Sequence, residues 1–207
     1  MSYQSRRLTG QERLINQDMQ EGLQEATVLQ FWQWAFSDLR SNNIRGIFAE
    51  WLVSQILHVP QKQRDTWDEW DLTTEEGVKI EIKTSAYVQT WAQNRHSKII
   101  FSGLRGRRYN ATTNTYTESA TYNADIYIFC VQIEQDSAQW NALDLQQWRF
   151  YVTTVETLRT LRVASLSLTT LHRLCKPLQA SELRIQAHHM IKEIVITRQS
   201  TQADHQP

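Results

Sequence analysis

The sequence predicts an α/β fold in which helices flank a central mixed β-sheet. Apolar residues recur at helical spacing in four segments, over 25–39, 43–57, 155–161 and 180–191. Short apolar or alternating runs of strand length lie between the two groups of helices, over 78–83, 97–102, 125–133 and 148–152. Because helices both precede and follow the strands, one sheet covered by helices is the favoured architecture. Residues 111–118 suit an inserted hairpin. The sequence therefore leaves open which run forms the third strand of the core sheet.

The composition predicts one folded domain over residues 1–207, with a polar extension over 1–22 and a disordered tail over 199–207. A hydrophobic content of 41% and eight tryptophans indicate a globular core. The 22 basic residues equal the 22 acidic residues, so the chain as a whole has no basic field. An enzyme acting on nucleic acid would have to segregate its charge.

The cysteine content and the N-terminal sequence predict a cytoplasmic protein. Cys130 and Cys175 are the only cysteines, and both stand in apolar surroundings without zinc-type spacing. Buried thiols in a reducing compartment are the expectation. The first residues carry no hydrophobic signal core and no run reaches membrane-spanning length, so we expect no contact with a membrane.

The residues around Gly77 predict a β-hairpin that brings two acids together. Strand alternation over 78–83 places three aliphatic side chains towards a core, and Lys79, Glu81 and Lys83 on the opposite face. A turn with Gly77 at a position of positive φ precedes this run. A three-residue loop over 75–77 sets Asp71 directly opposite Glu81. Their β-carbons are then roughly 5 Å apart.

Two carboxylates at that spacing repel each other unless a cation lies between them, which predicts a site for Mg²⁺ or Mn²⁺. Asp68 is an alternative ligand from the same acidic stretch, although strand alternation favours Asp71. Glu50 lies within the largely apolar helix 43–57, where an acid is costly to bury unless it is paired or ligates a metal. A solvated strand face is the plain alternative for the Glu81 and Lys83 pattern.

A helix with Glu50, a strand with Asp71 and the next strand with Glu81-Ile82-Lys83 together resemble the PD-(D/E)xK superfamily of restriction-endonuclease-like nucleases. The resemblance covers 44–85, and Trp70 stands where the proline of the motif would be. It implies a restriction-endonuclease-like sheet, metal ligation by Asp71 and Glu81 with support from Glu50, and Lys83 near the attacking water.

A stretch without any acidic residue, from Ile82 to Thr117, follows the second strand. We expect phosphate contacts from its cations, Arg95, Lys98, Arg105, Arg107 and Arg108, the last three on a loop with two glycines. A solvated surface loop is the alternative. Ser85 and Gln89 are further candidates to contact a phosphate or the metal-bound water, or else residues that begin a surface helix.

Together these features predict a Mg²⁺-dependent nuclease that hydrolyses phosphodiester bonds in DNA, an endonuclease of a restriction, repair or defence type. The sequence leaves open whether the protein forms a homodimer. The alternative from another class is a non-catalytic DNA-binding module that keeps the nuclease fold within a larger assembly. A carbohydrate-binding domain that uses the tryptophans is a third option, against which the Arg-rich, acid-free stretch argues.

Overall fold

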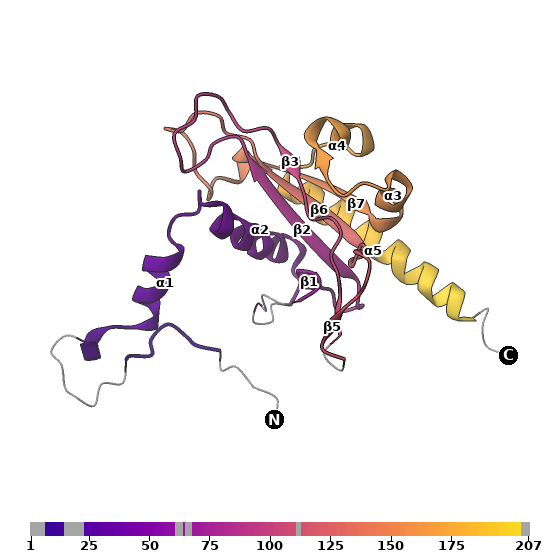
Figure 1. Cartoon of the computed structure of the whole chain (residues 1–207), viewed down its shortest axis with the longest axis horizontal. Helices are drawn as coiled ribbons and strands as arrows, with labels where there is room; N and C mark the ends of the chain where they lie inside the picture. The colour runs from indigo at the N-terminus through magenta and orange to yellow at the C-terminus, as the bar shows by residue number, and fades with distance from the viewer. Residues whose placement is uncertain (1–6, 15–22, 61–63, 65–67, 111–112, 204–207) are drawn as a thin grey trace.

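The computed structural model describes residues 7–14, 23–60, 64, 68–110 and 113–203. A mixed four-stranded sheet forms its centre, in the order β1 (Leu72–Thr73), β2 (Lys79–Ala86), β6 (Ile126–Gln132) and β7 (Trp148–Thr154). β2 and β6 are parallel, whereas β1 with β2 and β6 with β7 are antiparallel. Helices flank this sheet, which confirms the predicted fold class (Figure 1).

Helices α2 (Asn42–Leu57) and α5 (Ala180–Ala203) pack against one face of the sheet. The shorter helices α3 (Val155–Leu161) and α4 (Leu168–Leu174) contribute to a second core on the other face. Strand β6 separates the two cores, because alternate side chains such as Ile128 and Phe129 enter opposite ones. All seven of its residues are buried, as expected for a strand covered on both faces.

The predicted hairpin has the predicted register. Leu72 pairs with Ile80, and Thr74 N–H donates to the Val78 carbonyl at 3.0 Å. Gly77 has φ +78°, the conformation that its place in the turn required. One residue beyond the Leu72 pair, Asp71 lies opposite Glu81. The alternation holds too, since the aliphatic side chains of β2 are buried in the core beneath α2.

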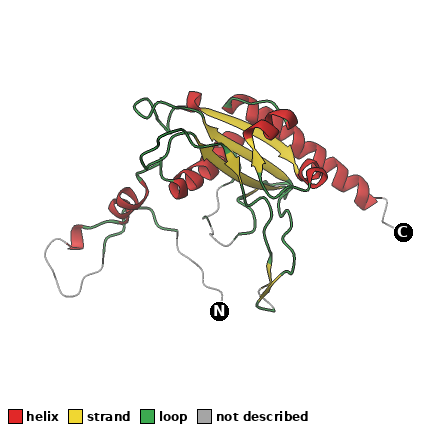
Figure 2. Cartoon of the chain, turned by 45° about the horizontal axis from the view of Figure 1, so that its top comes forward, coloured by secondary structure: helices red, strands yellow, loops and turns green. Residues whose placement is uncertain are grey.

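The predicted strand over 97–102 does not belong to the central sheet, and β6 is the third strand instead. Only Ile100–Phe101 of that run is a strand (β3), and it pairs with β8 (Leu166–Ser167), an element that the sequence did not predict. The apolar pattern of this run indicates that it is buried and does not specify its partner strand. Its backbone pairs with β8 and not with the central sheet. The inserted hairpin is present as β4 (Tyr109–Asn110) and β5 (Thr115–Tyr116), and it projects from the body (Figure 2).

The predicted disordered tail is wrong for residues 199–203, which continue helix α5. An ion pair of 2.6 Å between Arg198 and Asp125 holds this end of the helix beside the sheet. Side-chain hydroxyls also bond back to the helix, as Ser200 Oγ does to the Ile196 carbonyl at 3.1 Å. Residues 204–207 lie outside the described part.

The first predicted helix is shorter than expected and does not pack on the sheet. It spans Val28–Phe36 (α1), is capped by Thr27 and Gln30, and has no buried residue. Figure 1 shows it apart from the central sheet, on an N-terminal arm. Of the predicted polar extension, residues 7–14 run beside α1, where the Leu29 N–H donates to the Gly10 carbonyl. The short helices η1 (Leu23–Glu25) and η2 (Leu145–Gln147) complete the described elements.

Within the described residues, none of the helices is both long enough and apolar enough to span a membrane. Both cysteines are free thiols. Cys130 is fully buried in β6, and Cys175 is half-buried after α4.

Candidate active site

Glu81 and Lys83 lie on the same face of β2 and form an ion pair, with Lys83 Nζ 2.6 Å from Glu81 Oε1. Their side chains are only 16% and 26% exposed. Burial raises the pKa of the Glu81 carboxyl despite the neighbouring ammonium group. Burial therefore dominates over the ion pair at this carboxylate.

Asp71 enters the same site from the edge strand. Its Oδ2 atom accepts a hydrogen bond of 2.6 Å from the Ile82 backbone N–H. The pKa of its carboxyl is raised to about 7, chiefly by burial and further by the negative charges of Glu81 and Glu50. The hydrogen bond from Ile82 and the charge of Lys83 act in the opposite direction. Glu81 and Glu50 therefore lie close enough to Asp71 to influence its ionisation.

Glu50 approaches from helix α2, and its side chain is 16% exposed. Arg64 donates to both of its oxygens, from Nε to Oε2 at 2.5 Å and from Nη2 to Oε1 at 3.0 Å. Sequence reasoning missed Arg64, because no spacing rule links it to a helix residue that precedes it by fourteen positions. This bidentate pair fixes the Glu50 carboxylate at the side of the Asp71 and Glu81 pair.

The donor set suits a hard divalent cation, although it is not a closed cage. Among the described residues, no three acidic, histidine or cysteine side chains are grouped closely enough to enclose an ion. Mg²⁺ does not need such a cage, since it is usually held by one or two carboxylates together with waters and substrate phosphate oxygens. Burial raises the pKa of the Asp71 carboxyl most and the charges of Glu81 and Glu50 raise it further, so a cation bound beside it would favour its ionised form.

The alternative candidates are placed differently. Asp68 is exposed, whereas the hairpin register puts Asp71 opposite Glu81. Ser85 lies within β2, paired with Val131, and does not begin a helix. Gln89 is buried, and its side-chain amide donates to the Ala86 carbonyl at 2.8 Å. Ser85 and Gln89 therefore do not begin a surface helix, which was the alternative role for them.

The chain matches the family model described as Bacteriophage T4 endonuclease IV over residues 26–170. It belongs to this endonuclease IV family. The matched segment contains Glu50, Asp71, Glu81 and Lys83, together with all four strands of the central sheet. The protein is therefore a nuclease. Comparison with curated proteins found no match to this chain.

In this endonuclease IV family member, the loop after β3 contains Gly103 and Gly106 and is called the glycine loop below. It passes close to Lys83. A β-carbon on Gly103, which has φ +68°, would lie 3.9 Å from Lys83 Nζ. The loop is therefore adjacent to the carboxylate site, as its position in the sequence suggested. Two of its three arginines are turned to other partners within the protein, however.

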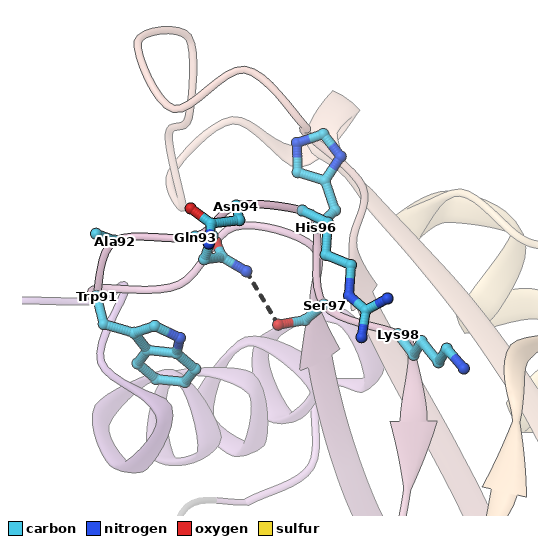
Figure 3. A pocket seen from close by; sticks show the side chains of 8 residues that line it. Trp91, Ala92, Gln93, Asn94, His96, Ser97 and Lys98 are labelled. Atoms are coloured by element: carbon cyan, nitrogen blue, oxygen red, sulfur yellow. Dashed lines mark hydrogen bonds between the residues drawn. The ribbon is translucent and has the colours of Figure 1, made fainter.

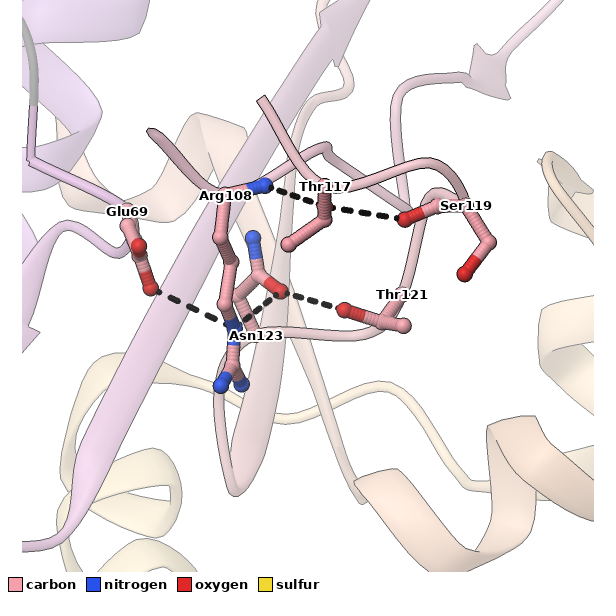
Figure 4. Close-up of polar contacts among 6 residues, drawn as sticks. All are labelled: Glu69, Arg108, Thr117, Ser119, Thr121 and Asn123. Carbon is pink, nitrogen blue, oxygen red and sulfur yellow. Dashed lines mark hydrogen bonds and ion pairs between the residues drawn. The ribbon is translucent and has the colours of Figure 1, made fainter. Parts of the chain in front are cut away.

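Arg105 lies over the Tyr122 ring, 4.8 Å from its centroid, and donates to the tyrosine oxygen at 3.3 Å. Arg108 forms an ion pair with Glu69 at 3.4 Å and donates to Asn123 at 3.1 Å (Figure 4). Arg107 is exposed and forms no ion pair or side-chain hydrogen bond within the described part of the chain. Arg107 is thus the member of this loop best placed to meet a phosphate.

Single alanine substitutions should separate these roles. Arg107→Ala should lower the slope of log affinity for DNA against log salt by about 0.9, the value for one lost phosphate contact. Arg105→Ala should instead destabilise the fold by about 1 kcal/mol, because it removes a cation–π contact and a hydrogen bond. Binding titrations across a salt series and urea unfolding measure the two effects. An equal salt response in both variants would contradict this assignment.

Proposed function

We propose that this endonuclease IV family member is a Mg²⁺-dependent deoxyribonuclease of the PD-(D/E)xK type that cuts internal phosphodiester bonds in DNA. The observation that carries the proposal is the hairpin register, which sets Asp71 opposite Glu81 while Lys83 contacts Glu81. The order of the elements supports the superfamily assignment: a helix with Glu50, then Asp71 directly before β1, then β2 with Glu81-Ile82-Lys83.

In this proposal Asp71 and Glu81 hold the Mg²⁺ ion, and Glu50 supports them from α2. Bound Mg²⁺ supplies Lewis acidity, which favours ionisation of the attacking water and stabilises charge on the phosphoryl group. Mn²⁺ accepts the same oxygen ligands. Arg64 keeps Glu50 in place through its two donors.

Lys83 has the second role. Its Nζ atom already lies beside the Glu81 carboxylate, so a substrate phosphate bound at the site would come within its reach. From there the ammonium group orients the attacking water and donates to a non-bridging phosphate oxygen as charge develops. The partial burial of Lys83 strengthens this electrostatic contribution relative to an exposed lysine.

The competing function is a DNA-binding module without catalysis. One observation favours it: each carboxylate already has a partner within the protein, Asp71 at the Ile82 N–H, Glu81 at Lys83 and Glu50 at Arg64. A site that is satisfied without a metal does not need one to fold. The two functions differ in a single observable, the cleavage of DNA.

Closed circular DNA is the decisive substrate, in both single-stranded and duplex form, because an exonuclease has no end to attack. The purified protein should open these circles with Mg²⁺ or Mn²⁺ and leave them closed in EDTA. RNA of matched length is the control for the choice of polymer. Binding of DNA without cleavage under every condition would overturn the catalytic proposal in favour of the binding module.

A further inference from the structure

A hydrogen-bonded loop with an exposed cationic surface follows the strand that carries Glu81 and Lys83. Gln93 lies at its centre, accepting from the Gln89 N–H at 2.8 Å and donating to the Tyr87 carbonyl at 3.1 Å. It also donates to Ser97 Oγ at 3.0 Å, so that it bridges the two arms of the loop (Figure 3). These bonds fix the backbone, and the other side chains of the loop are free to face outwards.

Residues 91–98 line a surface hollow of about 480 Å³. Trp91 is 55% exposed, although burial in a core is the ordinary place for tryptophan. Arg95 and Lys98 are exposed as well, and neither forms an ion pair within the described residues. They differ in this respect from Arg105 and Arg108, which have partners inside the protein. In Figure 3 His96 points to the other side of the loop from Trp91.

The hollow is separate from the carboxylate site. Glu81 and Ala86, where β2 ends, are five residues apart, which corresponds to roughly 17 Å along a strand. The loop begins beyond that point. The hollow therefore belongs to the segment that follows β2 and not to the strand that carries Glu81.

We propose that this hollow is a second DNA-binding site of the nuclease, which takes one nucleotide of the substrate strand away from the scissile phosphate. Arg95 and Lys98 bind the phosphate, and the sugar and base lie against the indole of Trp91. This inference rests on the proposed action on DNA. The site contributes affinity and not chemistry, because none of its residues reaches the carboxylates.

Three features select a nucleotide over a simple anion. Two unpaired cations beside each other attract a phosphate, while the exposed indole offers a flat apolar face of the kind on which bases and sugars pack. The stretch from Ile82 to Thr117 has no acid to compete for those cations. The fixed loop backbone lowers the entropic cost of binding, since the side chains are already gathered around the hollow.

The test compares two double variants that remove the same charge. Arg95→Ala/Lys98→Ala changes the hollow, and Arg184→Ala/Lys192→Ala changes two exposed cations on helix α5, outside the hollow. DNA affinity is measured without divalent cations across a salt series. The first variant should lower the log–log slope by roughly 0.7 to 0.9, the value for the one phosphate that the two cations bind together, and the α5 control should lower it by much less. Equal slopes in the two variants would overturn the site.

Trp91 is tested separately. Trp91→Ala should weaken binding by about five-fold or more at every salt concentration without changing the slope, because stacking releases no counterions. Trp91→Phe should restore most of the loss, and an alanine variant that binds like wild type would remove Trp91 from the site.

Cleavage of the same DNA distinguishes this inference from the proposed function. At saturating DNA the hollow variants should keep the wild-type rate, and their KM should rise. A wild type that binds DNA but never cuts it would defeat the catalytic proposal and leave the binding test intact. A hollow variant with unchanged KM and reduced kcat would contradict a role in binding.

Discussion

Replacing Lys83 by alanine should reduce cleavage of DNA by roughly 10² to 10⁴-fold, the range for loss of a positioned proton-transfer group. DNA affinity should change by less than about two-fold, because one cation among many contributes little to total phosphate attraction. The variant loses the ion pair with Glu81, which alone has a modest effect on stability. Single-turnover cleavage and equilibrium binding on the same DNA provide the two measurements.

Lys79→Ala is the matched control, since Lys79 belongs to the same strand and the same face. Its ammonium group lies 3.7 Å from the centroid of the Trp70 ring and forms a cation–π contact there. Its removal should cost about 0.5 to 1 kcal/mol of stability and leave the chemical rate within a few-fold. If Lys79→Ala and Lys83→Ala lose the same activity, Lys83 has no special role.

The second large effect concerns Asp71, whose replacement by asparagine should abolish cleavage and stabilise the metal-free protein above pH 7. The carboxyl has a pKa raised from 3.8 to about 7 in the folded state. Below pH 3.8 it is neutral in both states and costs nothing. As the pH rises towards 7, ionisation in the unfolded chain alone lowers stability, and the full loss is present above pH 7.

Asparagine removes that loss, since it does not ionise and can still accept the Ile82 hydrogen bond. At about 1.4 kcal/mol per pKa unit, the gain at pH 8 should be roughly 2 to 4 kcal/mol, and it should vanish near pH 3.5. Urea unfolding at several pH values in EDTA measures it. Asp68→Asn is the control, an exposed acid three positions away that should change neither activity nor the pH profile.

The roles would be reversed if Asp68→Asn lost activity while Asp71→Asn cut normally. A flat stability difference between Asp71→Asn and wild type across pH would instead mean that the pKa of the Asp71 carboxyl is not raised in the folded state. Added Mg²⁺ provides a further check, because it should stabilise the wild type and have little effect on Asp71→Asn.

The hairpin was the most predictable part of the fold, since its register follows from local rules. Alternation over 78–83, a glycine at the turn and the loop length together fixed the pairing of Asp71 with Glu81. Helix α3 was predicted over the same residues that it occupies, and α2 to within one residue, because apolar residues recur at helical spacing in both.

Long-range pairing was not predictable in the same way. The strand over 97–102 has the apolar pattern of a core strand, yet it pairs with β8, 65 residues further along the chain in the pair between Phe101 and Leu166. The pattern records burial and not the identity of the partner. Helix α1 shows the reverse case, since its apolar periodicity was clear but none of its residues is buried.

The candidate site was predictable in its backbone placement and not in its side-chain partners. Arg64 at Glu50, Glu69 at Arg108 and Tyr122 at Arg105 all come from segments that fold back over the site. Those partners leave Arg107 as the arginine of the glycine loop without an ion pair or side-chain hydrogen bond in the described part of the chain. Arg95 and Lys98 likewise form no ion pair within the described residues.

Anomalous diffraction from crystals soaked in Mn²⁺ tests most directly whether Asp71 and Glu81 form the metal site of a nuclease. We expect a Mn²⁺ peak between these two carboxylates, about 2.0 to 2.3 Å from an oxygen of each, with Lys83 displaced from Glu81 or beside it. The peak should be missing from Asp71→Asn crystals soaked in the same way. A peak at Asp68, or an Asp71 and Glu81 pair that stays without metal while the soaked enzyme cuts DNA, would contradict it.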